Sequence, residues 1–332
     1  MKKKHQNLFF LAGVSILALM LTQLDYAEVL QGISHAGYWF AAVIALWAVL
    51  YVFNTAAWWI IIKAPVADCL EVSQHDNHFT FLWLYKITVS GFALNYATPG
   101  GLMGGEPYKI MSLSPFIGTE RATSSVILHT MTHIFSHFWY WLIACLLFLL
   151  TERVTLPTAV ILITVTIFCL TAIWFFMKGY KNGIAHAIMR FLSFIPFVKH
   201  WARNFVDRHA HQLSAIDQQT AALHHQNPFR LASAVALELA CRILSSFEIM
   251  FVLLVVMPEV SFVRCLLILA FTSLVANILF FIPLQLGGRE GGFLMSVGGL
   301  GMTASSGIFV ALIVRLRELV WTGIGLLLIK IR

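Results

Sequence analysis

The sequence predicts an all-α polytopic membrane protein, with about seven to eight transmembrane helices and two re-entrant or broken helical hairpins. Hydrophobic residues make up 59% of the 332 residues and charged residues only 11%, with a mean hydropathy of +0.82. One soluble core cannot bury that much apolar surface, so the bilayer must act as solvent. Long apolar runs, and two glycine- and proline-rich interruptions, complete the prediction.

The apolar runs are the candidate transmembrane helices. A helix needs about 20 mostly apolar residues to cross roughly 30 Å of hydrocarbon. The stretches that meet this requirement are 8–24, 38–62, 120–150, 156–177, 229–257, 261–283 and 304–329. Residues 79–97 form a weaker candidate.

The N-terminus begins with Lys2, Lys3 and Lys4 before an apolar run, a pattern shared with cleavable signals. The segment around Tyr26 lacks the small-x-small motif that cleavage requires, so an uncleaved first helix is expected. The positive-inside rule places the N-terminus in the cytoplasm. The C-terminus, with Arg332, is expected there too, in a protein of the cell (inner) membrane.

A polar and basic connection at 178–228 divides the chain into a first membrane half, 1–177, and a second, 229–332. Apolar residues recur in it at helical spacing beside basic ones, which suits an interfacial helix. A solvated helical linker fits the same pattern. Topology and anionic lipid headgroups explain the net charge of +7 better than a nucleic-acid partner does, because the basic residues flank the spans.

Each half contains an interrupted apolar segment. In the hairpin predicted for 79–119, Asn95 and the Gly/Pro-rich stretch 98–107 break the helix. In the hairpin predicted for 261–302, Asn277, Pro283 and the glycines around Arg289 repeat the scheme. The two hairpins enter from opposite sides of the membrane, which predicts an inverted repeat of the kind found in transporters.

Two sequence motifs carry a resemblance to a known family. They are Pro99-Gly-Gly-Leu-Met-Gly-Gly-Glu106-Pro107-Tyr-Lys109, and Pro283-x3-Gly-Gly-Arg-Glu290-Gly-Gly with the later Arg315-Leu-Arg-Glu318. Over nearly its whole length the chain resembles the flippase-like transmembrane region of lysylphosphatidylglycerol synthases. The resemblance implies that lipid passes between leaflets. Synthase activity, which belongs to a soluble C-terminal domain, is not expected because the chain stops at Arg332, and the cargo stays open.

The first candidate binding group surrounds the first interruption. Glu106 and Lys109 are three residues apart and can pair on one face of a short helix beginning at Pro107, with Glu106 near the positive end of that helix. The members expected to contact a headgroup are Asn95, Gly100, Gly101, Gly104, Gly105, Glu106 and Lys109. The alternative is a structural hinge in which Glu106 fixes the hairpin.

Charges also mark the second hairpin and the last helix. Asn277, Gly288, Arg289 and Glu290 form the second group, and Arg315 and Glu318 the third. Charged side chains at membrane depth cost about 2.5–3.5 kcal/mol each, so they usually face a cavity. For the second group the alternatives are headgroup binding and a structural hinge. For the third group they are contact with a lipid phosphate and a structural tie between the last helix and the loop 287–292.

A histidine stripe lies on the predicted helix 120–150. His129, His133 and His137 recur every fourth residue and therefore share one face. The stripe is too long for one metal ion to touch all three imidazoles, since it extends about 12 Å at 1.5 Å per residue. Proton transfer, headgroup contact and a packed polar seam are the other interpretations. Glu238 and Arg242 are expected to form a structural pair one helical turn apart.

No nucleotide-binding or standard hydrolase motif is present, and the five cysteines show no paired spacing, so no cofactor or metal is expected. The favoured function is a flippase or transporter that binds and translocates a phosphate-bearing polar lipid, with membrane lipids as partners. One alternative is an intramembrane enzyme that uses Glu106, Glu290 or the histidines as acid and base. Another is a scaffold for a lipid- or glycan-modifying enzyme.

Overall fold

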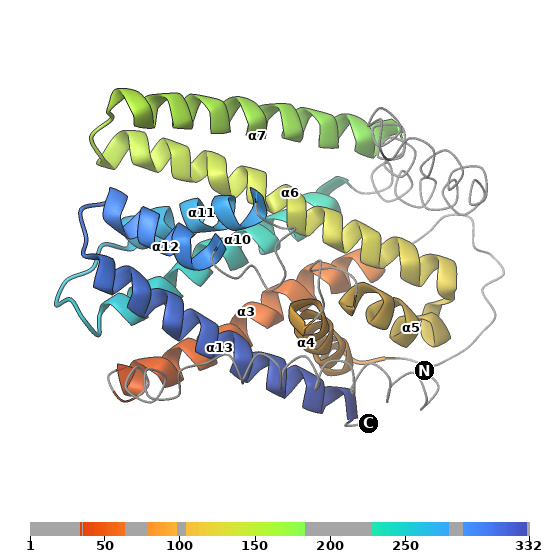
Figure 1. Ribbon diagram of the computed structural model, residues 1–332. Helices are drawn as coiled ribbons and strands as arrows, with labels where there is room; N and C mark the ends of the chain where they lie inside the picture. The colour runs from red at the N-terminus through yellow and green to blue at the C-terminus, as the bar shows by residue number, and fades with distance from the viewer. Residues whose placement is uncertain are drawn as a thin grey trace, which may run out of the picture.

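A computed structural model describes residues 34, 36–63, 79–97, 104–182, 228–278 and 288–330. Within these ranges every regular element is an α-helix (Figure 1). The helices are α3 (Tyr38–Ile62), α4 (Phe81–Ala97), α5 (Gly105–Ile117), α6 (Thr119–Thr151), α7 (Leu156–Asn182), α10 (Pro228–Leu253), α11 (Phe262–Ile278), α12 (Gly288–Gly299) and α13 (Ala304–Lys330). The predicted all-α membrane fold is confirmed.

The predicted apolar runs correspond closely to these helices. The run predicted at 38–62 is α3, and the run at 120–150 is α6 with one further residue at each end. The run at 229–257 ends earlier than predicted, because α10 stops at Leu253. Among the described residues, α3, α6 and the 156–178 part of α7 combine the length and hydropathy of a membrane span. The predicted first helix, 8–24, lies outside the described residues, and the total number of spans stays a prediction.

Each predicted hairpin consists of two helices that pack together. α4 packs on α5 in the first hairpin, and α11 packs on α12 in the second. The helix predicted to begin at Pro107 begins two residues earlier, at Gly105, because proline fits the first turn of a helix as well as its first position. Gly118 then separates α5 from α6 with φ at +81°, a conformation that glycine adopts without steric cost. Most of the predicted interfacial helix, 183–227, lies outside the described residues.

The helices form a bundle in which the two halves make equivalent contacts. α3 packs against α10. α4 packs on α13, and likewise α11 packs on α6. α5 packs on α6 as α12 packs on α13, and α3 contacts α4 as α10 contacts α11. Exchanging α3–α6 with α10–α13 therefore turns each of these helix pairs into another pair that is also in contact.

α7 stands outside this pattern. It lies alongside α6 at one edge of the bundle (Figure 1), and only 6% of its most apolar window is buried. Its exposed large apolar side chains include Val160, Ile161, Ile163, Ile167, Phe168, Leu170 and Trp174. An apolar surface of this length suits contact with lipid chains, so α7 gives the bundle a lipid-facing wall.

Small residues bring α4 and α13 close together. A Cβ atom added to Gly325 of α13 would lie 2.5 Å from the Cβ of Ala93 and 2.8 Å from the carbonyl oxygen of Val89. The hydroxyl of Ser90 donates a hydrogen bond to the Gly325 carbonyl at 3.0 Å. Such small-residue contacts with interhelical hydrogen bonds are how helices associate in membranes, where apolar burial alone gives little advantage.

Candidate functional site

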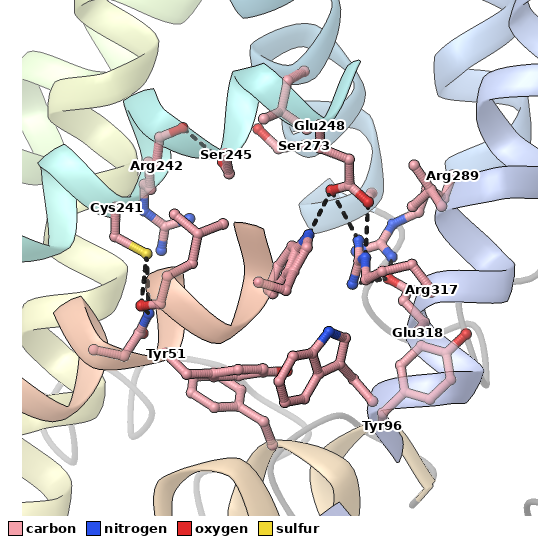
Figure 2. A pocket seen from close by; sticks show the side chains of 18 of the residues that line it. Tyr51, Tyr96, Cys241, Arg242, Ser245, Glu248, Ser273, Arg289, Arg317 and Glu318 are labelled. Atoms are coloured by element: carbon pink, nitrogen blue, oxygen red, sulfur yellow. Dashed lines mark hydrogen bonds and ion pairs between the residues drawn. The ribbon is translucent and has the colours of Figure 1, made fainter. Parts of the chain in front are cut away.

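A cavity of about 400 Å³ lies between the two halves of the bundle (Figure 2). Side chains of α3, α4, α6, α10, α11, α12 and α13 line it, whereas those of α5 and α7 do not. Its carboxylates and guanidiniums are Glu238, Arg242, Glu248, Arg289, Arg317 and Glu318. A cavity with this many charges, inside a bundle with apolar outer surfaces, is the strongest candidate for a functional site.

One face of α10 supplies much of the polar lining. Glu238, Cys241, Arg242, Ser245 and Glu248 all line the cavity. They are spaced three or four residues apart, or adjacent, so a helix presents them as one stripe. Their side chains project from α10 toward α3, α6 and α13, which makes α10 the central element of the site.

Glu238 forms a three-residue cluster with two histidines of α6. Its carboxylate is completely buried. Oε2 lies 2.8 Å from Nδ1 of His133, and Oε1 lies 3.2 Å from Nε2 of His129. His129 is closed off by Trp58, whose ring stacks on the imidazole with 5.7 Å between centroids. His133 is one-third exposed and lines the cavity.

The three histidines of the predicted stripe therefore have different surroundings. His137 also lines the cavity, but it makes no contact with Glu238. Its ring lies edge-on to that of His133, with 5.6 Å between centroids, and its Nδ1 is buried without a hydrogen-bond partner among the described residues. Two histidines thus lie against the Glu238 carboxylate, while the third has an unpartnered polar atom beside the cavity.

The expected local pair of Glu238 and Arg242 is wrong. Arg242 instead donates from Nε to Oγ of Ser136 at 2.7 Å and from Nη2 to the carbonyl of His133 at 2.9 Å. An i,i+4 pair on one helix contributes only about 0.2–0.5 kcal/mol, so contacts with the neighbouring α6 outweigh it. Arg242 therefore lines the cavity without an ion pair to any carboxylate in the described part of the chain.

Arg317 and Glu248 make a buried, two-pronged ion pair across the cavity (Figure 2). Nε and Nη2 of Arg317 donate to the two carboxylate oxygens at 2.8 and 3.1 Å. Trp47 donates from its indole nitrogen to the same carboxylate at 2.9 Å, and its ring lies 3.8 Å from the guanidinium. Both charges have partners within the protein, so this pair forms a fixed part of the cavity lining.

The charges of the second hairpin pair with α13. Arg289 pairs with Glu318, and Arg315 pairs with Glu290. Arg315 also donates to the hydroxyl of Tyr96 at 3.3 Å, which links α13 to the end of α4. The predicted tie between the last helix and the second hairpin is thus present. Arg289 and Glu318 also line the cavity, whereas Glu290 and Arg315 do not.

The remaining members of the second group flank the interruption of the same hairpin. Asn277, near the end of α11, lines the cavity and donates from its side-chain amide to the Ser273 carbonyl at 2.7 Å. Gly288 is the first residue of α12. The structure therefore brings Asn277 and Arg289 to the same cavity from opposite sides of the interruption.

The two charged residues of the first hairpin pair with each other. The predicted pair of Glu106 and Lys109 is confirmed, with Nζ 3.5 Å from Oε1. Asn95 donates to the same Oε1 at 3.1 Å and accepts from the backbone N–H of Gly105 at 2.8 Å. Only Asn95 of this group lines the cavity. Gly104 precedes α5, whereas Gly100 and Gly101 lie outside the described residues.

Several cavity residues were not among those selected from the sequence. They are chiefly Trp47, Asn54, Tyr96, Arg242, Glu248 and Arg317. The polar stripe along α10 was the available signal, since it places two carboxylates and a guanidinium on one face of an apolar helix. The contributions of α3 and α4 had no comparable signal, because single aromatic or amide residues in apolar helices are common.

The apolar outer surface and the charged cavity define a polytopic helical membrane protein with an internal polar site. The family model described as lysylphosphatidylglycerol synthase TM region matches residues 8–325, nearly the whole chain. The chain therefore belongs to this family, which indicates a membrane protein of lipid metabolism or transport. No curated protein and no solved structure matches it.

Proposed function

We propose that the protein binds the phosphate-bearing headgroup of a lipid in the cavity and translocates it between leaflets. The observation that carries this proposal is Arg242, a guanidinium at the cavity without a carboxylate partner in the described part of the chain. Its two protein hydrogen bonds go to neutral oxygens, so the remaining N–H groups of its guanidinium can donate to an anion. Guanidinium groups match phosphate oxygens in charge and geometry.

The rest of the lining supports a bound headgroup. A volume of about 400 Å³ is within the range of roughly 300–1,000 Å³ that is typical of small-molecule sites. Tyr51, Phe92 and Trp321 supply apolar walls, while His137 and Asn277 add polar atoms. Oδ1 of Asn54 and Nε1 of Trp321 are buried and have no partner within the described residues. Such atoms favour a polar occupant.

The arrangement of the two halves suggests how the site changes its exposure. We propose that α3–α6 and α10–α13 are the two units of the inverted repeat expected from the sequence. Their equivalent helix contacts support this relation. In transporters built this way, one unit rocks against the other around a site near the bilayer midplane. A cavity lined from both units supports such a mechanism.

Most of the polar residues selected from the sequence then fall into two roles. Those that line the cavity are proposed headgroup contacts, namely Asn95, His133, His137, Asn277, Arg289 and Glu318. Glu106 with Lys109, and Glu290 with Arg315, are proposed to hold the hairpins in place through their ion pairs. The positive-inside rule supports a location in the cell (inner) membrane with both termini cytoplasmic.

Proteoliposomes containing fluorescent phosphatidylglycerol test the proposal. Arg242→Gln is expected to slow translocation about tenfold or more, because a charge-assisted hydrogen bond contributes about 1.5–3 kcal/mol. The matched control is Arg264→Gln: Arg264 pairs with Glu152 at 2.9 Å and does not line the cavity. Gel filtration in detergent checks that both variants are folded. Equal rates for the folded wild type and Arg242→Gln would contradict the proposed site.

One observation favours a second candidate function, an intramembrane enzyme acting on a lipid-linked substrate. Glu238 holds Nδ1 of His133 at 2.8 Å while His133 lines the cavity, which is how a carboxylate orients a histidine base. Mass spectrometry of lipids incubated with the purified protein separates the two functions. A chemically altered lipid pool would favour the enzyme, and an unchanged pool with leaflet exchange favours translocation.

A further inference from the structure

The cluster of Glu238, His129 and His133 differs from the other ion pairs among the described residues, because its positive partners are histidines. Glu248 and Glu318 are paired with arginines, which stay charged at any working pH. Glu238 is buried on both carboxylate oxygens against imidazoles, at 3.2 and 2.8 Å. Imidazoles gain and lose a proton near neutral pH. The charge of this one cluster therefore depends on bound protons.

The groups that face the cluster come from its own two helices and from three others. From α10 they are Arg242 and Cys241, and from α6 itself His137 and Tyr140. From α3 they are Asn54, Tyr51 and Trp58, while Phe92 of α4 contacts the His133 ring. Lys109 of α5 lies behind Trp58, with Nζ 5.7 Å from its ring. No second carboxylate among the described residues contacts either histidine.

The net charge of Glu238, Arg242 and the two histidines depends on whether an imidazole carries a proton. The negative charge of Glu238 and the positive charge of Arg242 cancel when both histidines are neutral. One added proton leaves the cluster and Arg242 together with a single positive charge. An anionic headgroup entering the cavity restores neutrality, and neutral combinations are strongly favoured where the dielectric constant is low. A proton and an anionic headgroup therefore each favour the binding of the other.

We propose that the His129–Glu238–His133 cluster binds a proton together with an anionic headgroup, so that lipid movement is coupled to proton movement. This inference rests on the proposed function and adds proton coupling to the same site. By linkage, the headgroup raises the proton affinity as much as the proton raises the headgroup affinity.

Among the described residues, the cavity gives the proton access to the cluster through His133. His133 is one-third exposed and lines the cavity, whereas His129 is 2% exposed and covered by Trp58. His137 lies one turn further along α6, and its unpartnered Nδ1 places a second imidazole beside His133. Proton and headgroup thus share one entrance, so that whichever leaflet the cavity faces supplies and receives both.

Calorimetry on the full-length protein in detergent tests this coupling, with dihexanoylphosphatidylglycerol as the probe. Titrations in two buffers of different ionisation enthalpy give the number of protons taken up. We expect about one proton per bound probe at mildly alkaline pH, and an affinity that weakens roughly tenfold per pH unit there. Binding without proton uptake would overturn the coupling and leave the proposed function intact. Absence of any binding would overturn the proposed function, and the coupling with it.

Two variants locate the proton. Glu238→Gln keeps the shape of the side chain but removes the charge that holds the proton, so binding should become independent of pH and proton uptake should vanish. His133→Gln, at a partly exposed position, should reduce the uptake in the same way. Glu152→Gln, outside the cavity, is the matched control and should keep the full uptake. A purely structural role would weaken binding equally at every pH, and undiminished uptake in the two cluster variants would refute the assignment.

Discussion

The charged residues of the two broken hairpins find their partners in different places. In the α4–α5 hairpin, Glu106 pairs with Lys109 of the same helix and with Asn95 of the partner helix. In the α11–α12 hairpin, Arg289 and Glu290 both pair with residues of α13. The ion pair of the first hairpin is therefore internal to that hairpin. The position of the second hairpin depends on α13.

The sequence spacing of the charges explains this difference. Glu106 and Lys109 are three residues apart, so they lie on one face of α5 and reach each other. Arg289 and Glu290 are adjacent and point in different directions, so neither can pair with the other. Arg315 and Glu318 share a face of α13, where Glu318 pairs with Arg289 and Arg315 pairs with Glu290. Electrostatic changes should thus affect the second hairpin most, and steric changes the first.

Removing one partner of the second hairpin should have the largest effect. Glu318→Gln leaves Arg289 without its carboxylate and is expected to destabilise the protein by about 3 kcal/mol. This is the lower end of the range for buried pairs, because the Arg289 side chain is 33% exposed. Thermal unfolding in detergent measures the loss. The double variant Arg289→Gln/Glu318→Gln should lose less than the single one, and a greater loss would contradict the ion-pair explanation.

Adding a methyl group at Gly105 should have the next largest effect. The new Cβ would lie 2.6 Å from Oδ1 of Asn95 and would also clash with the Gly91 carbonyl. Such overpacking against backbone costs about 1–3 kcal/mol. The matched control is Gly291→Ala in the second hairpin, where a Cβ meets nothing within 4 Å. That control should be neutral or slightly stabilising, and equal unfolding temperatures for the two variants would show that the first hairpin is not tightly packed.

Breaking the charge pair of the first hairpin should have the smallest effect. Lys109→Met keeps the apolar stem that packs on Gly91 and removes the ammonium group. The expected loss of stability is about 1 kcal/mol, because Glu106 keeps its hydrogen bond from Asn95. Thermal unfolding beside Glu318→Gln gives the comparison. A larger loss for Lys109→Met than for Glu318→Gln would reverse the distinction between the hairpins.

The fold was largely predictable because its main determinant is local. Apolar runs of span length and the glycine and proline interruptions specify where helices begin and end, and α3 and α6 follow those limits within a residue. The pairing of Glu106 with Lys109 was predictable for the same reason, since helix spacing fixes it. The pairing of Glu238 was not, because helix spacing pointed to Arg242 while the packing of α6 supplied His129 and His133.

By itself, the sequence determined the membrane environment, the helices, the two interruptions and the family, because hydropathy, helix periodicity and local motifs are properties of adjacent residues. Only the tertiary structure decided which charges meet. The cavity is assembled from helices as far apart in the chain as α3 and α13, and a buried charge takes the partner that packing brings within reach. For that reason Arg242 and the Glu238 cluster emerge as the site only in the folded protein.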